Sequence, residues 1–85
     1  MEIEEVFSSK PRMKILKLIY QLGQLNVSDL ARRINMNYTA TAGHLKILEQ
    51  EKIIEVRVYG RVHMYRISES ERAKTVGALI EAWKK

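Results

Sequence analysis

The chain has 85 residues, of which 29% are charged, and its formal net charge at pH 7 is +5. This length suits a single domain over residues 1–85 with a modest hydrophobic core. The absence of cysteine excludes disulfides and thiolate metal sites. No apolar run approaches the roughly 18 residues of a membrane span, and the acidic first residues do not resemble a signal peptide. We therefore expect a cytoplasmic protein with no membrane partner.

The positive charge is unevenly distributed along the sequence. Residues 1–9 carry three glutamates and no base, whereas residues 10–48 carry seven bases against one aspartate, a local charge of +6. A basic block of this kind favours a polyanionic partner such as nucleic acid. An ordinary solvated surface could have the same composition, so charge alone does not decide between the two.

The first third of the chain predicts two helices. Ile3, Val6 and Phe7 form a short amphipathic segment. A longer apolar helix is expected to begin within residues 8–11, where serine is a good cap and proline suits the first turn. This helix should end at Gly23.

Two further helices are expected in the middle of the chain. Val27 could join a very short strand, and Ser28 is a good cap for a helix that ends before Asn35. The chain must turn sharply at Asn35 through a left-handed conformation, which asparagine tolerates better than most residues. Asn37 is then expected to cap a third helix over residues 38–51.

After residue 53 the hydrophobic period becomes that of a strand. Ile54, Val56 and Val58 alternate with polar residues, and residues 62–67 are again β-branched and aromatic, so a hairpin with its turn at Gly60 is expected.

A last helix through Trp83 should follow a capping box formed by Ser68 and Glu71. The predicted fold class is therefore mainly α with a small β-hairpin, in the helix-helix-helix-strand-strand-helix order of a winged helix-turn-helix.

One face of the third helix has the composition of a groove-binding surface. A step of about 100° per residue points Thr41, Leu45 and Leu48 into the core. The opposite side combines two small residues, a hydroxyl and one base: Thr39, Ala42, Gly43 and Lys46. Small residues let a helix lie deep in the major groove, where threonine and lysine reach base edges or phosphates. The glycine could instead be only a weak position in a surface helix, costing about 1 kcal/mol relative to alanine.

The predicted wing, residues 57–63, is a second candidate surface. Arg57, Tyr59 and Arg61, with His63 nearby, suit contact with phosphates or an adjacent minor groove. Arginine on an edge strand could equally prevent edge-to-edge pairing between sheets.

Few residues suggest chemistry. The two histidines, His44 and His63, lack carboxylate or thiolate neighbours at a metal-ligand spacing, so no metal and no cofactor are expected. His44 is expected to be a partly buried structural residue. We find no serine–histidine–acid arrangement and no phosphate-binding glycine loop, so the chain is not expected to be an enzyme. Tyr38 could reach a phosphate or pack on the preceding helix.

Three segments together resemble the ArsR-type winged-helix repressors. The sequence VSDLARRINMN (residues 27–37) with GHLKIL (43–48) resembles the helix-turn-helix of that family. SSKPRMKIL (8–16) resembles its first core helix, and GRVHMYRI (60–67) resembles its wing. The resemblance implies a homodimer built from the first and last helices. A two-fold dimer would read a near-palindrome with recognition helices roughly 34 Å apart.

The chain departs from the family at several positions. The family often has glycine where Asn35 stands, valine at Thr41 and a second histidine at Gly43. The cysteine pair that senses metal in some members, and the histidine-and-acid motif of the final helix in others, are missing. The metal response of the family is therefore not expected here.

The terminal helices, residues 1–8 and 70–85, are predicted to form the dimer interface. Their apolar residues follow helical spacing: Ile3, Val6, Phe7, Val76, Leu79, Ile80 and Trp83. The last helix could instead only cover its own core.

The sequence thus predicts a dimeric transcription regulator that binds double-stranded DNA in a sequence-specific manner, with its third helix in the major groove. The predicted DNA-contacting residues are Asn37, Tyr38, Thr39, Ala42, Gly43, Lys46, Arg57, Tyr59 and Arg61. Lys10, Arg12 and Arg33 should add electrostatic attraction. The alternatives are a winged-helix module that binds another protein and a sequence-independent architectural DNA binder.

Overall fold

The computed structural model of the chain describes residues 1–84. Its helices and strands are α1 (Ile3–Phe7), α2 (Lys10–Leu22), β1 (Gln24–Leu25), α3 (Val27–Ile34), α4 (Tyr38–Gln50), β2 (Ile54–Tyr59), β3 (Val62–Ile67) and α5 (Glu71–Ala82). This order confirms the predicted winged helix-turn-helix. Within the described range, no helix combines the length and the hydropathy needed to cross a membrane.

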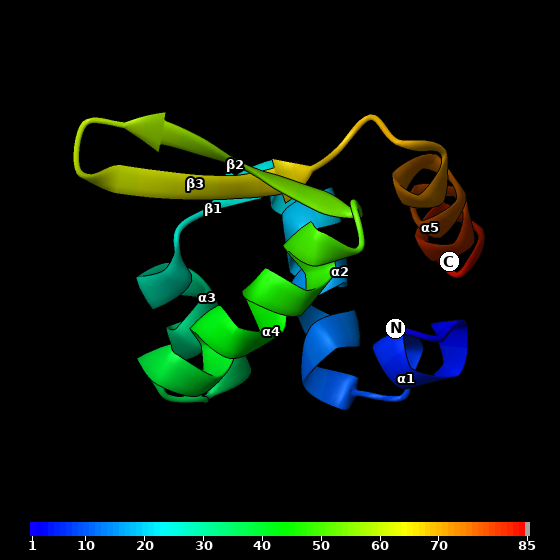
Figure 1. Cartoon of the computed structure of the whole chain (residues 1–85), viewed down its shortest axis with the longest axis horizontal. Helices are drawn as coiled ribbons and strands as arrows, with labels where there is room; N and C mark the ends of the chain where they lie inside the picture. The colour runs from blue at the N-terminus through cyan, green and yellow to red at the C-terminus, as the bar shows by residue number, and fades with distance from the viewer. Residues whose placement is uncertain (85) are drawn as a thin grey trace.

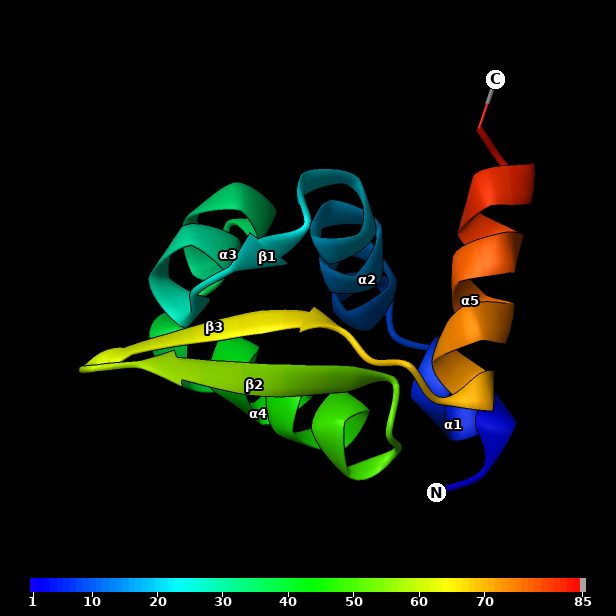
Figure 2. The ribbon, with the colours of Figure 1, turned by 90° about the horizontal axis from the view of Figure 1, so that it is seen from above.

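The hairpin and the terminal helices lie at opposite ends of the molecule. The β2–β3 hairpin lies over α3 and α4, and its tip projects past both helices (Figure 1). The terminal helices α1 and α5 lie at the opposite end of the molecule, with α2 between the two ends (Figure 2). The three strands form an antiparallel sheet in the order β1-β3-β2.

The core fills the space between the sheet and the central helices. Most of its large, fully buried side chains come from α2, α3 and α4, and two come from the start of β2 and the residue before it: Ile15, Leu16, Ile19, Leu30, Leu45, Leu48, Ile53 and Ile54. Each such side chain contributes about 1.5–3 kcal/mol of burial free energy. Thr41 is also fully buried, and its hydroxyl donates a hydrogen bond to the Asn37 carbonyl at 2.8 Å. The predicted core stripe of α4 is therefore confirmed.

The prediction for the start of α3 was wrong. Its cap is Asn26, whose Oδ1 accepts a hydrogen bond from the Asp29 amide at 2.8 Å, so Ser28 lies inside the helix. This start makes Val27 a buried helical residue, and the short strand forms just before it, at residues 24–25.

The start of α5 also differs from the predicted capping box of Ser68 and Glu71. The cap is Ser70, whose hydroxyl oxygen accepts a hydrogen bond from the Ala73 amide at 3.1 Å. The Ser68 hydroxyl instead donates to the Lys52 carbonyl, which ties the end of the hairpin to the loop after α4.

The turn between α3 and α4 forms at the predicted residue. Asn35 adopts a left-handed conformation with φ of 59° and ψ of 49°. The Met36 amide then donates a hydrogen bond to the Ala31 carbonyl at 2.9 Å, which closes the end of α3. This geometry sets the direction in which α4 leaves the turn.

Asn35→Ala should therefore lower the free energy of unfolding by about 1 kcal/mol, because the left-handed conformation is costly for an ordinary L-residue. Asn35→Gly is the matched control and should be at least as stable as the wild type. Urea unfolding followed by circular dichroism measures both. Equal destabilisation by alanine and glycine would mean that the asparagine side chain, not its backbone, stabilises the turn.

Candidate nucleic-acid interface

The exposed face of α4 contains three of the four residues predicted to line it. Thr39, Gly43 and Lys46 are exposed, and helical geometry places them within about 60° of one another. Ala42 is a partial correction, because it is half-buried and packs against the core. It lies only about 60° from Leu45 around the helix, too close to the core stripe to face outward fully.

No contact within the chain explains why position 43 is a glycine. A β-carbon built at this position would meet no atom within 4 Å, so packing does not require a glycine. Its backbone is ordinary helix, where glycine is about 1 kcal/mol less favourable than alanine. The glycine therefore leaves open space above this part of the exposed face of α4.

The two predicted DNA-contacting residues at the start of α4, Asn37 and Tyr38, have different roles. The Oδ1 atom of Asn37 accepts a hydrogen bond from the Ala40 amide at 2.7 Å, so this side chain acts as the helix cap. Tyr38 is exposed beside it and faces the hairpin across a small cleft. Tyr38 thus has its whole ring and hydroxyl beside the cleft, whereas the Asn37 side chain is partly used by the cap.

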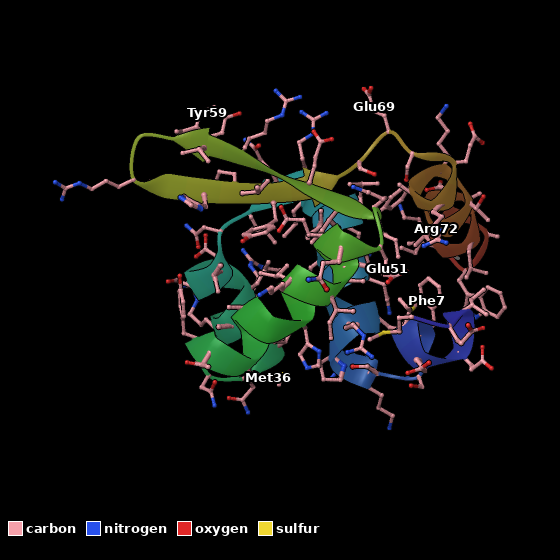
Figure 3. The ribbon with its side chains drawn as sticks, in the orientation of Figure 1. Phe7, Met36, Glu51, Tyr59, Glu69 and Arg72 are labelled. Atoms are coloured by element: carbon pink, nitrogen blue, oxygen red, sulfur yellow. The ribbon has the colours of Figure 1, made fainter. Side chains whose placement is uncertain are left out.

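The hairpin separates its candidates onto two faces. Cross-strand partners share a face, and the pairs Ile54–Ile67 and Val56–Tyr65 lie on the inner face, against the core. The pairs Arg57–Met64 and Tyr59–Val62 therefore lie on the outer face, and Figure 3 shows Tyr59 on the side of the hairpin away from α3 and α4.

Arg57 also forms a salt bridge with a neighbouring glutamate. Its Nε lies 3.2 Å from Glu55 Oε2, and the same oxygen lies 3.3 Å from Arg66 Nε. The structure therefore does not bring Arg57 and Tyr59 together with α4. Among the predicted wing residues that were considered for DNA contact, Arg61 in the turn and His63 on the inner face line the cleft with Tyr38, and Val62 and Tyr65 also contribute to its lining. The two-residue alternation of the strands is the sequence signal that could have separated them.

Arg12 is not part of a basic surface, contrary to the prediction. It is 9% exposed, and its Nε and Nη2 donate to the carbonyls of Val6 and Glu5 at 2.8 and 2.6 Å. Its Nη1 lies 3.1 Å from His44 Nδ1 on α4. Arg12 therefore joins the end of α1 to the helix that carries the candidate interface. Lys10 and Arg33 are exposed, as expected.

His44 has the structural role that was predicted. It is half-buried, and burial lowers the pKa of its imidazole, with a further lowering by the nearby Arg12 charge. The neutral ring can accept the Arg12 hydrogen bond at Nδ1, whereas a protonated ring cannot. No group of three potential metal ligands among His, Cys, Asp and Glu occurs within residues 1–84.

The predicted dimer residues separate into two groups. Val6, Val76 and Ile80 are buried in the core of their own chain, and Phe7 is half-buried against it. The exposed members are Ile3 (72%), Leu79 (47%) and Trp83 (78%).

Leu79 stands between two apolar grooves. One groove, of about 760 Å³, lies between α1 and α5 and is lined in part by Ile3, Phe7 and Val76. The other, of about 620 Å³, is lined in part by Met13, Ile80 and Trp83.

Two contacts determine how α5 lies. The Tyr20 hydroxyl donates a hydrogen bond to Glu81 Oε2 at 2.8 Å, and a β-carbon on Gly77 would lie 3.2 Å from the Tyr20 ring. At the other end of the helix, Arg72 Nη1 lies 2.8 Å from Glu51 Oε1, and Figure 3 shows these two side chains together. The exposed face of α5 is therefore held in one orientation.

Comparison with known proteins supports a regulator. The model of the MarR family matches residues 9–57. The arsenical resistance operon repressor of Escherichia coli (strain K12) is 25% identical over 83 residues, which cover 98% of this chain and 71% of the repressor.

Solved structures share the whole fold. A homodimeric winged helix-turn-helix DNA-binding domain from Mycobacterium bovis, described as a possible ArsR-family regulator, superposes with a TM-score of 0.77 at 28% identity, covering 92% of this chain and 70% of that one. The transcriptional repressor BigR from Xylella fastidiosa has a TM-score of 0.82 at 23% identity, covering 93% and 77%.

The pKa of His44 predicts a loss of stability in acid. As the pH falls below the ordinary histidine value of 6.5, the unfolded chain takes up a proton before the folded chain does. The free energy of unfolding should therefore decrease as the pH falls from 7 to 5. His44→Gln should reduce this decrease, whereas His63→Gln should preserve it. Urea unfolding at a series of pH values measures the effect, and an unchanged slope in His44→Gln would contradict it.

Proposed function

Since this chain belongs to the MarR family, we propose that it is a dimeric transcription repressor that acts in the cytoplasm and binds DNA through α4. Sequence-specific DNA binding and regulation of transcription are the activity of the winged helix-turn-helix proteins that it resembles. The observation that carries the assignment to α4 is its exposed face of Thr39, Gly43 and Lys46, where glycine has no internal cause.

In this proposal α4 enters the major groove, which is wide enough to admit a helix. Gly43 allows the helix backbone to approach the base pairs closely, while Thr39 and Lys46 reach base edges. Arg61 in the wing and Tyr38 at the start of α4 contact the flanking backbone. Contacts to phosphates position the protein, and contacts to bases provide sequence preference.

A second copy of the chain is the proposed partner at the other end. The exposed apolar side chains of Ile3, Leu79 and Trp83 border the two grooves beside α5. Burial of this surface is favourable at roughly 25 cal/mol per Å². A homodimeric relative at 28% identity supports a homodimer. Two α4 helices related by a two-fold axis would then read half-sites about 34 Å apart.

Substitutions on α4 and in the wing should affect DNA binding differently. Lys46→Ala and Thr39→Ala should change which sequences are selected from a random duplex pool, each weakening the preferred site about 5- to 100-fold, because they remove base contacts. Arg61→Ala should weaken all sequences about equally and reduce the slope of log affinity against log salt by about 0.9.

Lys74→Ala is the matched control, because this exposed lysine lies on α5, at the opposite end of the molecule. It should leave both the selected sequence and the affinity unchanged. Selection without any sequence preference would favour an architectural DNA binder. Absence of duplex binding would favour a module that binds protein, and would overturn the proposal.

Leu79→Glu and Trp83→Glu should each shift the protein from dimer to monomer, because they bring a carboxylate into an apolar interface. The expected particle changes from twice the 9.9 kDa chain mass to that mass itself, measured by sedimentation equilibrium. Leu22→Glu adds the same charge to an exposed leucine that lines neither groove and should remain dimeric. A dimer that persists in both α5 variants would require a different interface.

A further inference from the structure

A small cleft of about 310 Å³ lies between the inner face of the hairpin and the amino-terminal ends of α3 and α4. Its polar lining residues are Asn26, Ser28, Tyr38, Arg61, His63 and Tyr65. Cross-strand pairing of Val58 with His63 and of Val56 with Tyr65 accounts for the inward placement of both side chains. Hydroxyl-bearing and cationic residues of the hairpin, α3 and α4 therefore border one cleft.

The charge of the cleft is positive, and none of its lining residues is acidic. Arg61 and His63 form no ion pair with any carboxylate of residues 1–84, whereas Arg57 and Arg66 on the outer face share Glu55. The cleft is thus a place where cationic side chains remain available.

The neighbouring ionisable groups do not neutralise this charge. On α3, Asp29 follows Ser28 directly, but its carboxylate is paired with Arg32 at 2.9 Å. On β3, burial raises the pKa of Tyr65, with smaller effects of Glu49 and Tyr38, so its hydroxyl remains a donor. The hydroxyl of Tyr38 completes the set from α4. An oxyanion placed in the cleft would be bordered by hydroxyl-bearing and cationic residues, with no like charge among the lining residues.

We propose that this cleft binds one phosphate of the DNA backbone and that His63 makes the contact sensitive to pH. The inference rests on the proposed function, because the phosphate belongs to the duplex that α4 enters. Histidine is the side chain that gains its charge between about pH 8 and pH 5. A protonated imidazole donates a charge-assisted hydrogen bond to a phosphate oxygen, whereas the neutral ring contributes no charge. DNA binding should therefore tighten as the pH falls.

The test compares the salt dependence of duplex binding at pH 8 and pH 5.5, using the full chain and its selected duplex. The wild type should bind about tenfold more tightly at pH 5.5, and its slope against log salt should be steeper by about 0.9 because one more phosphate is neutralised. His63→Gln should show its pH 8 behaviour at both pH values. His63→Arg should show the wild-type pH 5.5 behaviour at both.

His44→Gln is the control, since it removes the other imidazole and should keep the difference between the two pH values. If His63→Gln binds DNA and retains the full difference, the inference is overturned while the proposed function stands. If no variant binds a duplex, the proposed function fails first. In that case, inorganic phosphate is added to the free protein to test whether the cleft binds a free anion. Shifts of the His63 ring resonances in nuclear magnetic resonance spectra would identify such a site and overturn the DNA assignment.

Discussion

The arrangement of this molecule depends on the buried guanidinium of Arg12. A cation in a protein interior is costly unless its donors are satisfied, and here two carbonyls of α1 and the His44 ring accept its hydrogen bonds. These acceptors belong to the first helix of the chain and to the candidate recognition helix. The short α1, which buries only one side chain of its own, is thereby attached to α4.

The two ends of the molecule have opposite requirements, and α2 separates them. If the hairpin end binds DNA as proposed, its surface must be polar and cationic, with side chains that lack internal partners. If the α5 end binds a second copy as proposed, its surface must be apolar and held rigidly enough to match a copy of itself. Tyr20 meets the second requirement, because its ring and hydroxyl position Gly77 and Glu81 of α5. A chain of this size builds both surfaces around one core.

Local sequence patterns predicted the elements, because the hydrophobic period is a property of neighbouring residues, although the caps of α3 and α5 lie two residues from the predicted serines. The αL turn at Asn35, the stripe of α4 and the turn at Gly60 all lie where the pattern placed them. Contacts between segments that are distant in the sequence were harder to predict. Whether Val76 or Leu79 faces the core depends on how α5 rests on α2, and this depends on the Tyr20 contact 57 residues away from Gly77.

The same distinction applies to the candidate interface. Helical geometry identified Thr39, Gly43 and Lys46, but Arg12 was assigned to the surface because a charge count does not reveal burial. Only the fold shows that carbonyls across the bend at residues 8–9 enclose its guanidinium. In the hairpin, the strand alternation was present in the sequence, yet the choice of inner and outer face followed from which pairs meet the core.

The empty space above Gly43 has a consequence for changing the properties of this protein. A β-carbon there meets no atom of its own chain within 4 Å, and alanine would improve the intrinsic preference of α4 for the helix. Folding and recognition are therefore separable at this position. Alanine at Gly43 would strengthen the scaffold while it narrows the approach to α4, so that a change in partner binding would report on that approach and not on folding.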